Sequence, residues 1–315
     1  MNPRPASPFA VGLAYALVCV VWGSTYLFIK IGVEVLPPYL LGGVRFSIAG
    51  AVLVAACLLT GRRLPTDWRT FRRAALVGIL LLVIGNGLLN AGERELSSGL
   101  AALFVATFPI WTTLIAQFGS GAERLGAAGW IGLAVSLAGV AILVKPFESG
   151  VESSWTGVAA VLTASFMWAI GTVYARRRLA GVDPFDASAV ETIVAGPLML
   201  GVHLALERGE PVVWGAQAWL AVGYLAVMGS LVGFTAFVFI TAHMTSSKVG
   251  TYAYVNPVVA VLLGWLVLEE PVTWRLALGG ATILAGLLLV YVARVRVRPA
   301  GQPPAEAIGA ACREG

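Results

Sequence analysis

Charged residues are scarce in this sequence, and their scarcity excludes an ordinary soluble globular protein. Asp, Glu, Lys and Arg make up only 12% of the 315 residues, against 58% hydrophobic residues and a mean hydropathy of +0.86. A soluble chain of this length needs more charge to cover its surface, so the surplus apolar surface must face lipid. The formal net charge of +5 reflects membrane topology, and we expect no nucleic-acid partner.

Cysteine and recognisable catalytic motifs are also scarce. The three cysteines, Cys19, Cys57 and Cys312, cannot form a disulfide framework. The sequence contains no nucleotide-binding Walker pattern, no cluster of His, Cys and carboxylates, and no nucleophile elbow. We therefore expect no metal, no cofactor and no enzymatic activity. An intramembrane enzyme that acts on lipid is the alternative from another class, but it needs a convergent catalytic cluster that the sequence does not offer.

Long apolar runs fill most of the chain. Each of them has about 20 residues, enough for a helix to cross a hydrocarbon core of about 30 Å. They predict an all-α polytopic membrane protein with ten transmembrane helices, near residues 11–29, 38–59, 73–92, 98–118, 127–144, 155–176, 186–206, 217–240, 247–268 and 274–294.

The sequence contains an internal duplication, which decides the architecture. A constant offset of 146 relates Trp22 to Trp168, Pro38 to Pro184, Arg45 to Glu191, and Gly50 to Gly196. Offsets of 147 to 148 relate Pro109 to Pro257, Glu123 to Glu270, and Gly132 to Gly279. Each half holds five spans, an odd number, so the halves are inverted repeats around a midplane site.

The duplication divides the chain into two similar units with short flanking segments. We expect a cytoplasmic N-terminus, a first repeat, a connecting loop, a second repeat and a disordered cytoplasmic tail, at residues 1–9, 10–144, 145–154, 155–294 and 295–315.

The basic residues indicate the orientation. Fifteen of them fall on the face that holds both termini and five on the opposite face, with Arg45 inside a span, which accounts for all 21. Basic residues accumulate in cytoplasmic loops. Both termini are therefore expected in the cytoplasm.

Several of these residues resemble those of a known family. The stretch Trp22-Gly-Ser-Thr, Lys30, the pair Pro37-Pro38, Arg45-Phe46, and the prolines within spans four and nine resemble the drug/metabolite transporter superfamily. Within it, residues 10–294 are similar to the ten-helix EamA-type exporters of bacterial inner membranes. The resemblance implies a multi-pass inner-membrane transporter, and its YddG-like branch implies export of aromatic amino acids.

Two charges and two prolines inside spans are candidates for gating. Arg45 and Glu191 each lie seven residues past a proline, about 10 Å into the membrane at about 1.5 Å per residue. Intramembrane charges normally face the bundle interior with a partner. Each one either anchors neighbouring helices or contacts substrate. Pro109 and Pro257 each leave a carbonyl without its helical donor, which predicts kinks that serve either packing or alternating access.

Aromatic and amide residues within spans are the candidate substrate-binding set. Aromatic rings supply area for an apolar side chain, and amides in a membrane need a partner or water. Interhelical packing and hydrogen bonding are the competing interpretation. The set comprises Trp22, Tyr26, Asn86, Asn90, Phe108, Trp111, Trp168, Tyr252 and Asn256.

The sequence therefore predicts a secondary transporter that exports small organic metabolites by alternating access around a central cavity. Aromatic or other amino acids are the best-supported substrate class, and nucleosides, sugars or cationic drugs are the alternative. The expected partners are a small-molecule substrate and the lipid bilayer. We expect a monomer or a weak homodimer, and the sequence leaves open whether transport is coupled to protons.

Overall fold

The structure is a computed structural model, and it describes residues 7–62, 64–65, 67–116, 126–144, 154–244 and 246–297. Most of the expected connecting loop, the C-terminal tail from residue 298 and Glu123 lie outside the described residues.

The described residues form helices and no strands. Eight of the helical segments are long and apolar enough to cross a membrane, and two shorter apolar helices, Ala127–Leu143 and Tyr252–Leu268, bring the number to ten. The ten-helix, all-α fold expected from the sequence is confirmed. The spans of the first half are α1 (Pro8–Val33), α2 (Pro38–Leu59), α3–η1–α4 (Trp68–Gly78, Ile79–Asn86, Gly87–Glu95), α5–α6 (Ser98–Val105, Phe108–Ala116) and α7 (Ala127–Val144). Those of the second half are α8 (Trp155–Arg178), α9 (Pro184–Leu206), α10–η2–α11 (Ala216–Tyr224, Leu225–Val232, Gly233–His243), α13 (Tyr252–Leu268) and α14 (Trp274–Val297).

The ninth span differs from the sequence prediction at its start. We expected a helix from residue 247, but a short helix α12 (Ser246–Val249) comes first and α13 begins at Tyr252. Gly250 and Thr251 form the turn between the two helices. Glycine loses more backbone entropy in a helix than other residues, so an interruption at Gly250 costs little.

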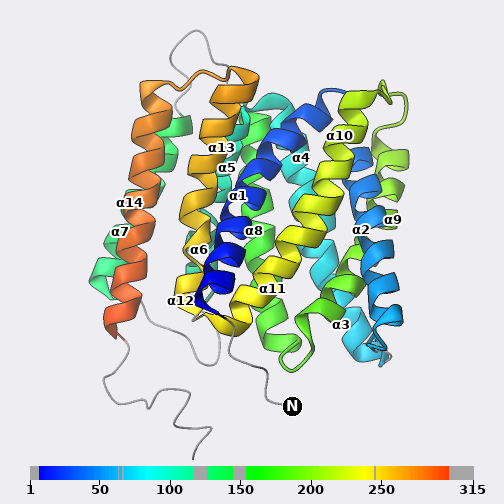
Figure 1. The fold of residues 1–315 in the computed structure, drawn as a ribbon. Helices are drawn as coiled ribbons and strands as arrows, with labels where there is room; N and C mark the ends of the chain where they lie inside the picture. Colours follow the sequence, from blue (N-terminus) through cyan, green and yellow to red (C-terminus); the bar gives the residue numbers. More distant parts are fainter. Residues whose placement is uncertain are drawn as a thin grey trace, which may run out of the picture.

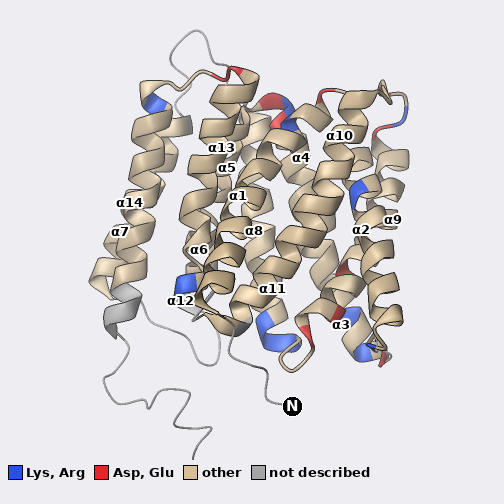
Figure 2. Cartoon of the chain, in the orientation of Figure 1, with Lys and Arg blue, Asp and Glu red and all other residues tan. Residues whose placement is uncertain are grey.

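The bundle has two ends that differ in what they hold. We call the end where α1 begins and α14 ends the proximal end, and the end where α1 finishes and α14 begins the distal end (Figure 1). Most Lys, Arg, Asp and Glu side chains gather at these two ends, with few along the helices (Figure 2). This distribution matches a protein whose middle lies in hydrocarbon.

The two halves pack against each other through equivalent helices. Helix α2 packs on α9, its counterpart in the second half, and α7 packs on α14 in the same way. At the α2–α9 contact, a methyl group on Gly50 would lie 2.7 Å from the backbone of Ile193, and one on Gly196 would lie 2.5 Å from the backbone of Ser47. Ile193 is itself the counterpart of Ser47, at the offset of 146. The contact therefore has approximate two-fold symmetry.

Other interior contacts also cross between the halves. Helix α1 packs on α11 and α13 of the second half, and α8 packs on α4, α5 and α6 of the first. The outward faces stay apolar, with Trp265 and Leu262 about half exposed on α13 (53% and 50%). Exposed apolar surface of this kind is suited to lipid.

Candidate functional site

The third and eighth spans each contain a π-helical segment, at equivalent positions. Segment η1 covers Ile79–Asn86 and η2 covers Leu225–Val232, so the two are separated by 146 residues, the offset of the duplication. A π-helix closes its hydrogen bonds one residue later than an α-helix, and such segments are frequent at functional sites. Non-helical backbone within a membrane is tolerated only where protein or water satisfies it.

In η1, one backbone carbonyl accepts two side-chain hydrogen bonds. The indole Nε1–H of Trp168, from α8 in the second half, donates to the Leu81 carbonyl at 2.5 Å. The Asn86 side-chain amide donates to the same carbonyl at 3.2 Å. The indole lies directly on Gly85, where a methyl group would approach Trp168 Cδ1 to 2.2 Å. Two of the predicted substrate-binding residues therefore converge on this segment.

The equivalent contact in η2 uses the other half's tryptophan. Trp22 Nε1–H, from α1, donates to the Gly229 carbonyl at 3.1 Å, and its indole lies on Gly233. Leu81 and Gly85 precede Gly229 and Gly233 by 148 residues each, two more than the offset of 146 that relates the two tryptophans and the two π-helical segments. The two contacts are therefore similar but shifted by two residues: a tryptophan of each half binds the π-helical segment of the other half.

Trp22 also belongs to a cluster of rings. Its ring centroid lies 5.0 Å from that of Phe237 and 5.2 Å from that of Tyr252, which is edge-on to it. One turn further along α13, the Asn256 amide, oriented to suit its neighbours, donates to the carbonyls of Cys19 and Tyr252, both at 3.1 Å. These contacts join α1, α11 and α13.

The other predicted pocket residues occupy separate places. Tyr26 is buried in the largest apolar core, and Asn90 donates to the Pro38 carbonyl at 3.0 Å. Trp111 donates to the Thr107 hydroxyl at 3.1 Å and packs edge-on against Phe166. The ninth, Phe108, is partly buried at the start of α6.

The nine predicted substrate-binding residues therefore belong to several interhelical contacts. None of them lines the cavity at the proximal end that is described below.

The two intramembrane charges do not pair with each other in the described structure. Arg45 is buried, with 7% of its surface exposed, and its Nε–H donates to the Ser230 hydroxyl of η2 at 3.0 Å. Glu191 is partly buried, and its backbone packs against Gly78, just before η1. The two equivalent residues thus each contact the π-helical region of the opposite half.

The two prolines have different effects on their helices. Pro109 lies just after a break at Ala106 and Thr107 that separates α5 from α6. Pro109 has no N–H to donate to the Val105 carbonyl. That carbonyl instead accepts a hydrogen bond from the Ser165 hydroxyl of α8 at 3.3 Å. Helix α13 instead continues through Pro257.

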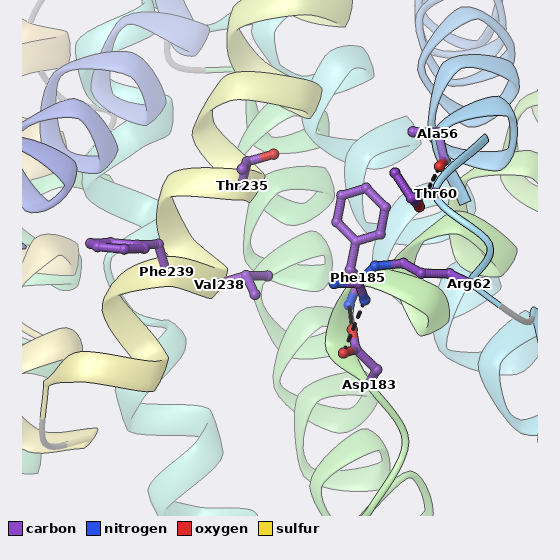
Figure 3. Close-up of a pocket in the computed structure, with 8 residues that line it drawn as sticks. All are labelled: Ala56, Thr60, Arg62, Asp183, Phe185, Thr235, Val238 and Phe239. Carbon is purple, nitrogen blue, oxygen red and sulfur yellow. Dashed lines mark hydrogen bonds and ion pairs between the residues drawn. The ribbon is translucent and has the colours of Figure 1, made fainter. Parts of the chain in front are cut away.

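Sequence reasoning missed a cavity that lies at the proximal end. It has a volume of about 320 Å³ (Figure 3). It is lined by Ala56, Thr60, Arg62, Asp183, Phe185, Thr235, Val238 and Phe239.

An ion pair lies in the wall of this cavity (Figure 3). Arg62 Nη1 lies 3.0 Å from Asp183 Oδ2 and 3.6 Å from Asp186 Oδ1, and the guanidinium carbon is 5.2 Å from the centre of the Phe185 ring. Partial burial opposes ionisation of Asp183, but hydrogen bonds from the Phe185 N–H and from Arg62 outweigh it and hold the pKa of this carboxyl below its ordinary value. The same hydrogen bond raises the pKa of Arg62. Both groups are therefore charged at neutral pH.

A buried carboxyl, Glu93, was also missed because it lies one residue beyond the expected third span. A signal for it was present, since Asn86, Asn90 and Glu93 follow helical spacing along one face. Arg62 and Asp183 had no comparable signal, because charges beside span ends are expected in any membrane protein.

Comparisons with known proteins agree with this architecture. The model of the EamA-like transporter family matches the chain twice, at residues 10–145 and 155–292. The chain is 39% identical to the inner membrane transporter YedA of Escherichia coli strain K12 over 258 residues, which cover 80% of this chain and 81% of YedA. It is 28% identical to the transporter YdfC of Bacillus subtilis, covering 89% and 90%. A solved crystal structure with 25% identity superposes with a TM-score of 0.65, covering 93% of this chain and all of the other. The chain belongs to the EamA-like transporter family.

Proposed function

We propose that this transporter exports small organic metabolites, with amino acids that carry apolar or aromatic side chains as the preferred class, across the bacterial inner membrane. Both termini are cytoplasmic in this proposal, so the proximal cavity faces the cytoplasm and receives the solute. The halves then close that side and open the distal side by alternating access.

The duplicated contact between a tryptophan and a π-helical segment carries the proposal. Each contact joins the two halves at interrupted backbone within a span, through Trp168 and Leu81 in one case and Trp22 and Gly229 in the other. Because the halves are inverted, the two contacts are related by the same inversion that relates the two gates of an alternating-access transporter. A structural membrane protein has no need of such a pair.

The chemistry of the proximal cavity supports the substrate class. Arg62 and Asp183 offer a positive and a negative group, the complements of the carboxylate and ammonium of an amino acid. Phe185 and Phe239 add ring surface beside them. An incoming zwitterion can exchange the protein's own ion pair for two pairs with itself, while its apolar side chain packs on the rings.

Counterflow in proteoliposomes tests this function. Purified protein is reconstituted with excess unlabelled L-tryptophan inside, and uptake of labelled L-tryptophan is measured with nucleosides, sugars and a cationic drug as competitors. We expect exchange that other aromatic amino acids inhibit. In Asp183→Asn we expect the half-saturating concentration to rise about 10-fold, which corresponds to about 1.4 kcal/mol of lost binding.

Thr235→Val is the matched control, since Thr235 lines the same cavity but its hydroxyl donates to the Leu231 carbonyl of its own helix. It should leave the half-saturating concentration unchanged. Exchange inhibited only by nucleosides, sugars or cationic drugs would move the assignment to that class, and absence of any counterflow would remove the proposal.

A further inference from the structure

Glu93 is a carboxyl enclosed entirely by protein. It lies near the distal end of α4 with 0% of its surface exposed. Neither carboxyl oxygen has a hydrogen-bond partner among the residues that the structure describes. The proposed transport mechanism so far gives this residue no role.

The nearest positive charge, Lys30 of α1, is fully engaged elsewhere. Its ammonium donates to the carbonyls of Glu93 at 2.8 Å, Leu96 at 3.0 Å and Arg94 at 3.4 Å. An ammonium has three donors, and here three backbone carbonyls accept them. Lys30 thereby ties α1 to the connection between α4 and α5.

A second carboxylate, Glu270, acts on Glu93 from the connection after α13. Unlike Glu93, it is well satisfied: its oxygens accept from the Ser98 N–H at 2.7 Å, the Ser98 hydroxyl at 2.9 Å and the Gly99 N–H at 3.3 Å. These donors belong to the first turn of α5, where a negative charge is favoured. The donors of Ser98 and Gly99 therefore serve Glu270 and are not available to Glu93.

The other packed elements offer Glu93 no compensating cation within the described chain. Besides Lys30, α1 presents the Tyr26 ring, whose hydroxyl interacts electrostatically with Glu93. Next to Glu93 on α4, Gly92 packs against Val161 of α8. One turn and a half earlier, Gly87 packs against the Tyr39 ring of α2. An ionised carboxylate enclosed in this way lacks the donors that it requires.

We infer that Glu93 is a proton-binding site that is protonated when the distal end is closed and ionised when it is open. Loss of the proton leaves a carboxylate that needs either water or the Lys30 ammonium. Either choice opens the distal end, because Lys30 must release the three carbonyls that it holds or water must enter between α1 and α4. On closure, one proton from water binds a carboxylate oxygen, and on opening it returns to water.

This inference rests on the alternating access proposed above, and it adds that distal closure takes up one proton. Two measurements test it on the full chain, and neither requires a transported solute. The first is infrared spectroscopy of the reconstituted protein at neutral pH. We expect a carbonyl stretching band from a protonated carboxylic acid that disappears in Glu93→Gln. It should remain in Glu210→Gln, which removes a carboxylate paired with Arg94 at the same end.

The second measurement follows opening of the distal end by labelling a cysteine. Leu96→Cys is placed in a background without Cys19, Cys57 and Cys312, and a water-soluble thiol reagent is added at several pH values. Leu96 is 2% exposed, so its labelling reports opening. Val212→Cys corrects for thiol chemistry, since Val212 is 39% exposed in the distal connection before α10.

We expect the ratio of the two labelling rates to rise several-fold as the pH is raised. In Glu93→Gln, which mimics the protonated form, the ratio should stay low at every pH. An unchanged pH response in Glu93→Gln would overturn the inference. So would the absence of a protonated-carboxyl band from the unmodified protein, a result that does not depend on whether any variant folds. Failure of counterflow with L-tryptophan would leave both readouts intact.

Discussion

At the scale of single residues, the two π-helical segments differ in how many side chains donate to the carbonyl that binds the tryptophan. It accepts from both Trp168 and Asn86, whereas Trp22 is the side chain seen to donate to the Gly229 carbonyl in the other half. Two donors on one acceptor compensate for each other when one is lost. The two π-helical segments should therefore respond differently to the same loss.

This difference predicts a non-additive pair. Trp168→Phe and Asn86→Ala should each lower stability by about 1 kcal/mol or less, while the double variant should lose about 1 kcal/mol more than their sum, because the buried carbonyl then lacks a side-chain donor. Trp22→Phe is the matched control and should show its full loss alone. Thermal unfolding in a mild detergent measures all four. Strict additivity would show that the shared carbonyl does not couple the two side chains.

The Asp183 carboxyl predicts the pH dependence of the proximal ion pair. Its pKa is lower in the folded protein than in the unfolded chain, so its contribution to stability is present above the unfolded value and is lost as the pH falls through the lower, folded value. The unfolded value is about 3.9. The contribution of the ion pair to the free energy of unfolding should therefore be constant across neutral pH and should decrease only under strongly acidic conditions.

Asp183→Asn tests this expectation. It should lower the thermal midpoint at neutral pH by an amount that shrinks as the protein is acidified. A difference between variant and parent that grows on acidification would show that the sign is reversed.

At the scale of helices, the break in the fourth span involves hydrogen bonds from a second helix as well as Pro109. Pro109 cannot donate to the Val105 carbonyl, and Ser165 of α8 supplies the hydrogen bond instead. The Ser165 hydroxyl also lies 3.1 Å from that of Thr107, within the break. The interruption is thus supported from the opposite half.

This contact predicts that a substitution in one helix can compensate for a substitution in another. Ser165→Ala should destabilise the protein by about 1 kcal/mol, and adding Pro109→Ala should restore part of the loss, because alanine returns an N–H to the Val105 carbonyl. The restored helix should also slow transport by stiffening a span that we expect to move. Pro257→Ala in the Ser165→Ala background is the control and should restore nothing.

The positions of the helices could be predicted from the sequence, but their interruptions could not. Apolar length alone defines a span, so nine of the ten expected helices begin close to where the structure has them. The π-helical segment Ile79–Asn86 is almost entirely apolar and contains no proline, so its own sequence is that of an ordinary membrane-spanning helix. Within it, the Leu81 carbonyl accepts a hydrogen bond from the indole of Trp168, which lies 87 positions later in the chain. A local sequence pattern cannot reveal such a contact.

The candidate site shows the same limit. The sequence identifies Trp22, Trp168, Asn86 and Asn256 as candidate pocket residues, and the two amides as side chains that must face the interior. It does not reveal that their partners are backbone carbonyls. Nor does it reveal the cavity beside Arg62, which forms only where the ends of α2, α9 and α11 meet.

At the scale of the whole molecule, helix α1 begins and helix α14 ends at the same end of the bundle (Figure 1). The excess of basic residues there predicts that this end is cytoplasmic. A reporter enzyme that is active only in the periplasm should give no signal when fused to the C-terminus. The same reporter inserted at Gly209, in the distal connection before α10, should give a strong signal. The opposite pattern would show that the molecule is oriented the other way.

The contact between α7 and α14 has a consequence for how such a gene arises. A methyl group on Gly132 would lie 2.7 Å from the Gly286 carbonyl, and one on Gly286 would lie 2.5 Å from the Gly132 carbonyl; Gly139 and Gly279 repeat this reciprocity. Reciprocal contacts are those of a homodimer with a two-fold axis. In genetic terms, the duplicated sequence and the reciprocal contact are what a tandem fusion of two copies that pack in antiparallel orientation leaves behind. Fusion then released the copies to diverge, so that arginine stands at position 45 and glutamate at its counterpart, position 191, a difference that identical subunits cannot carry.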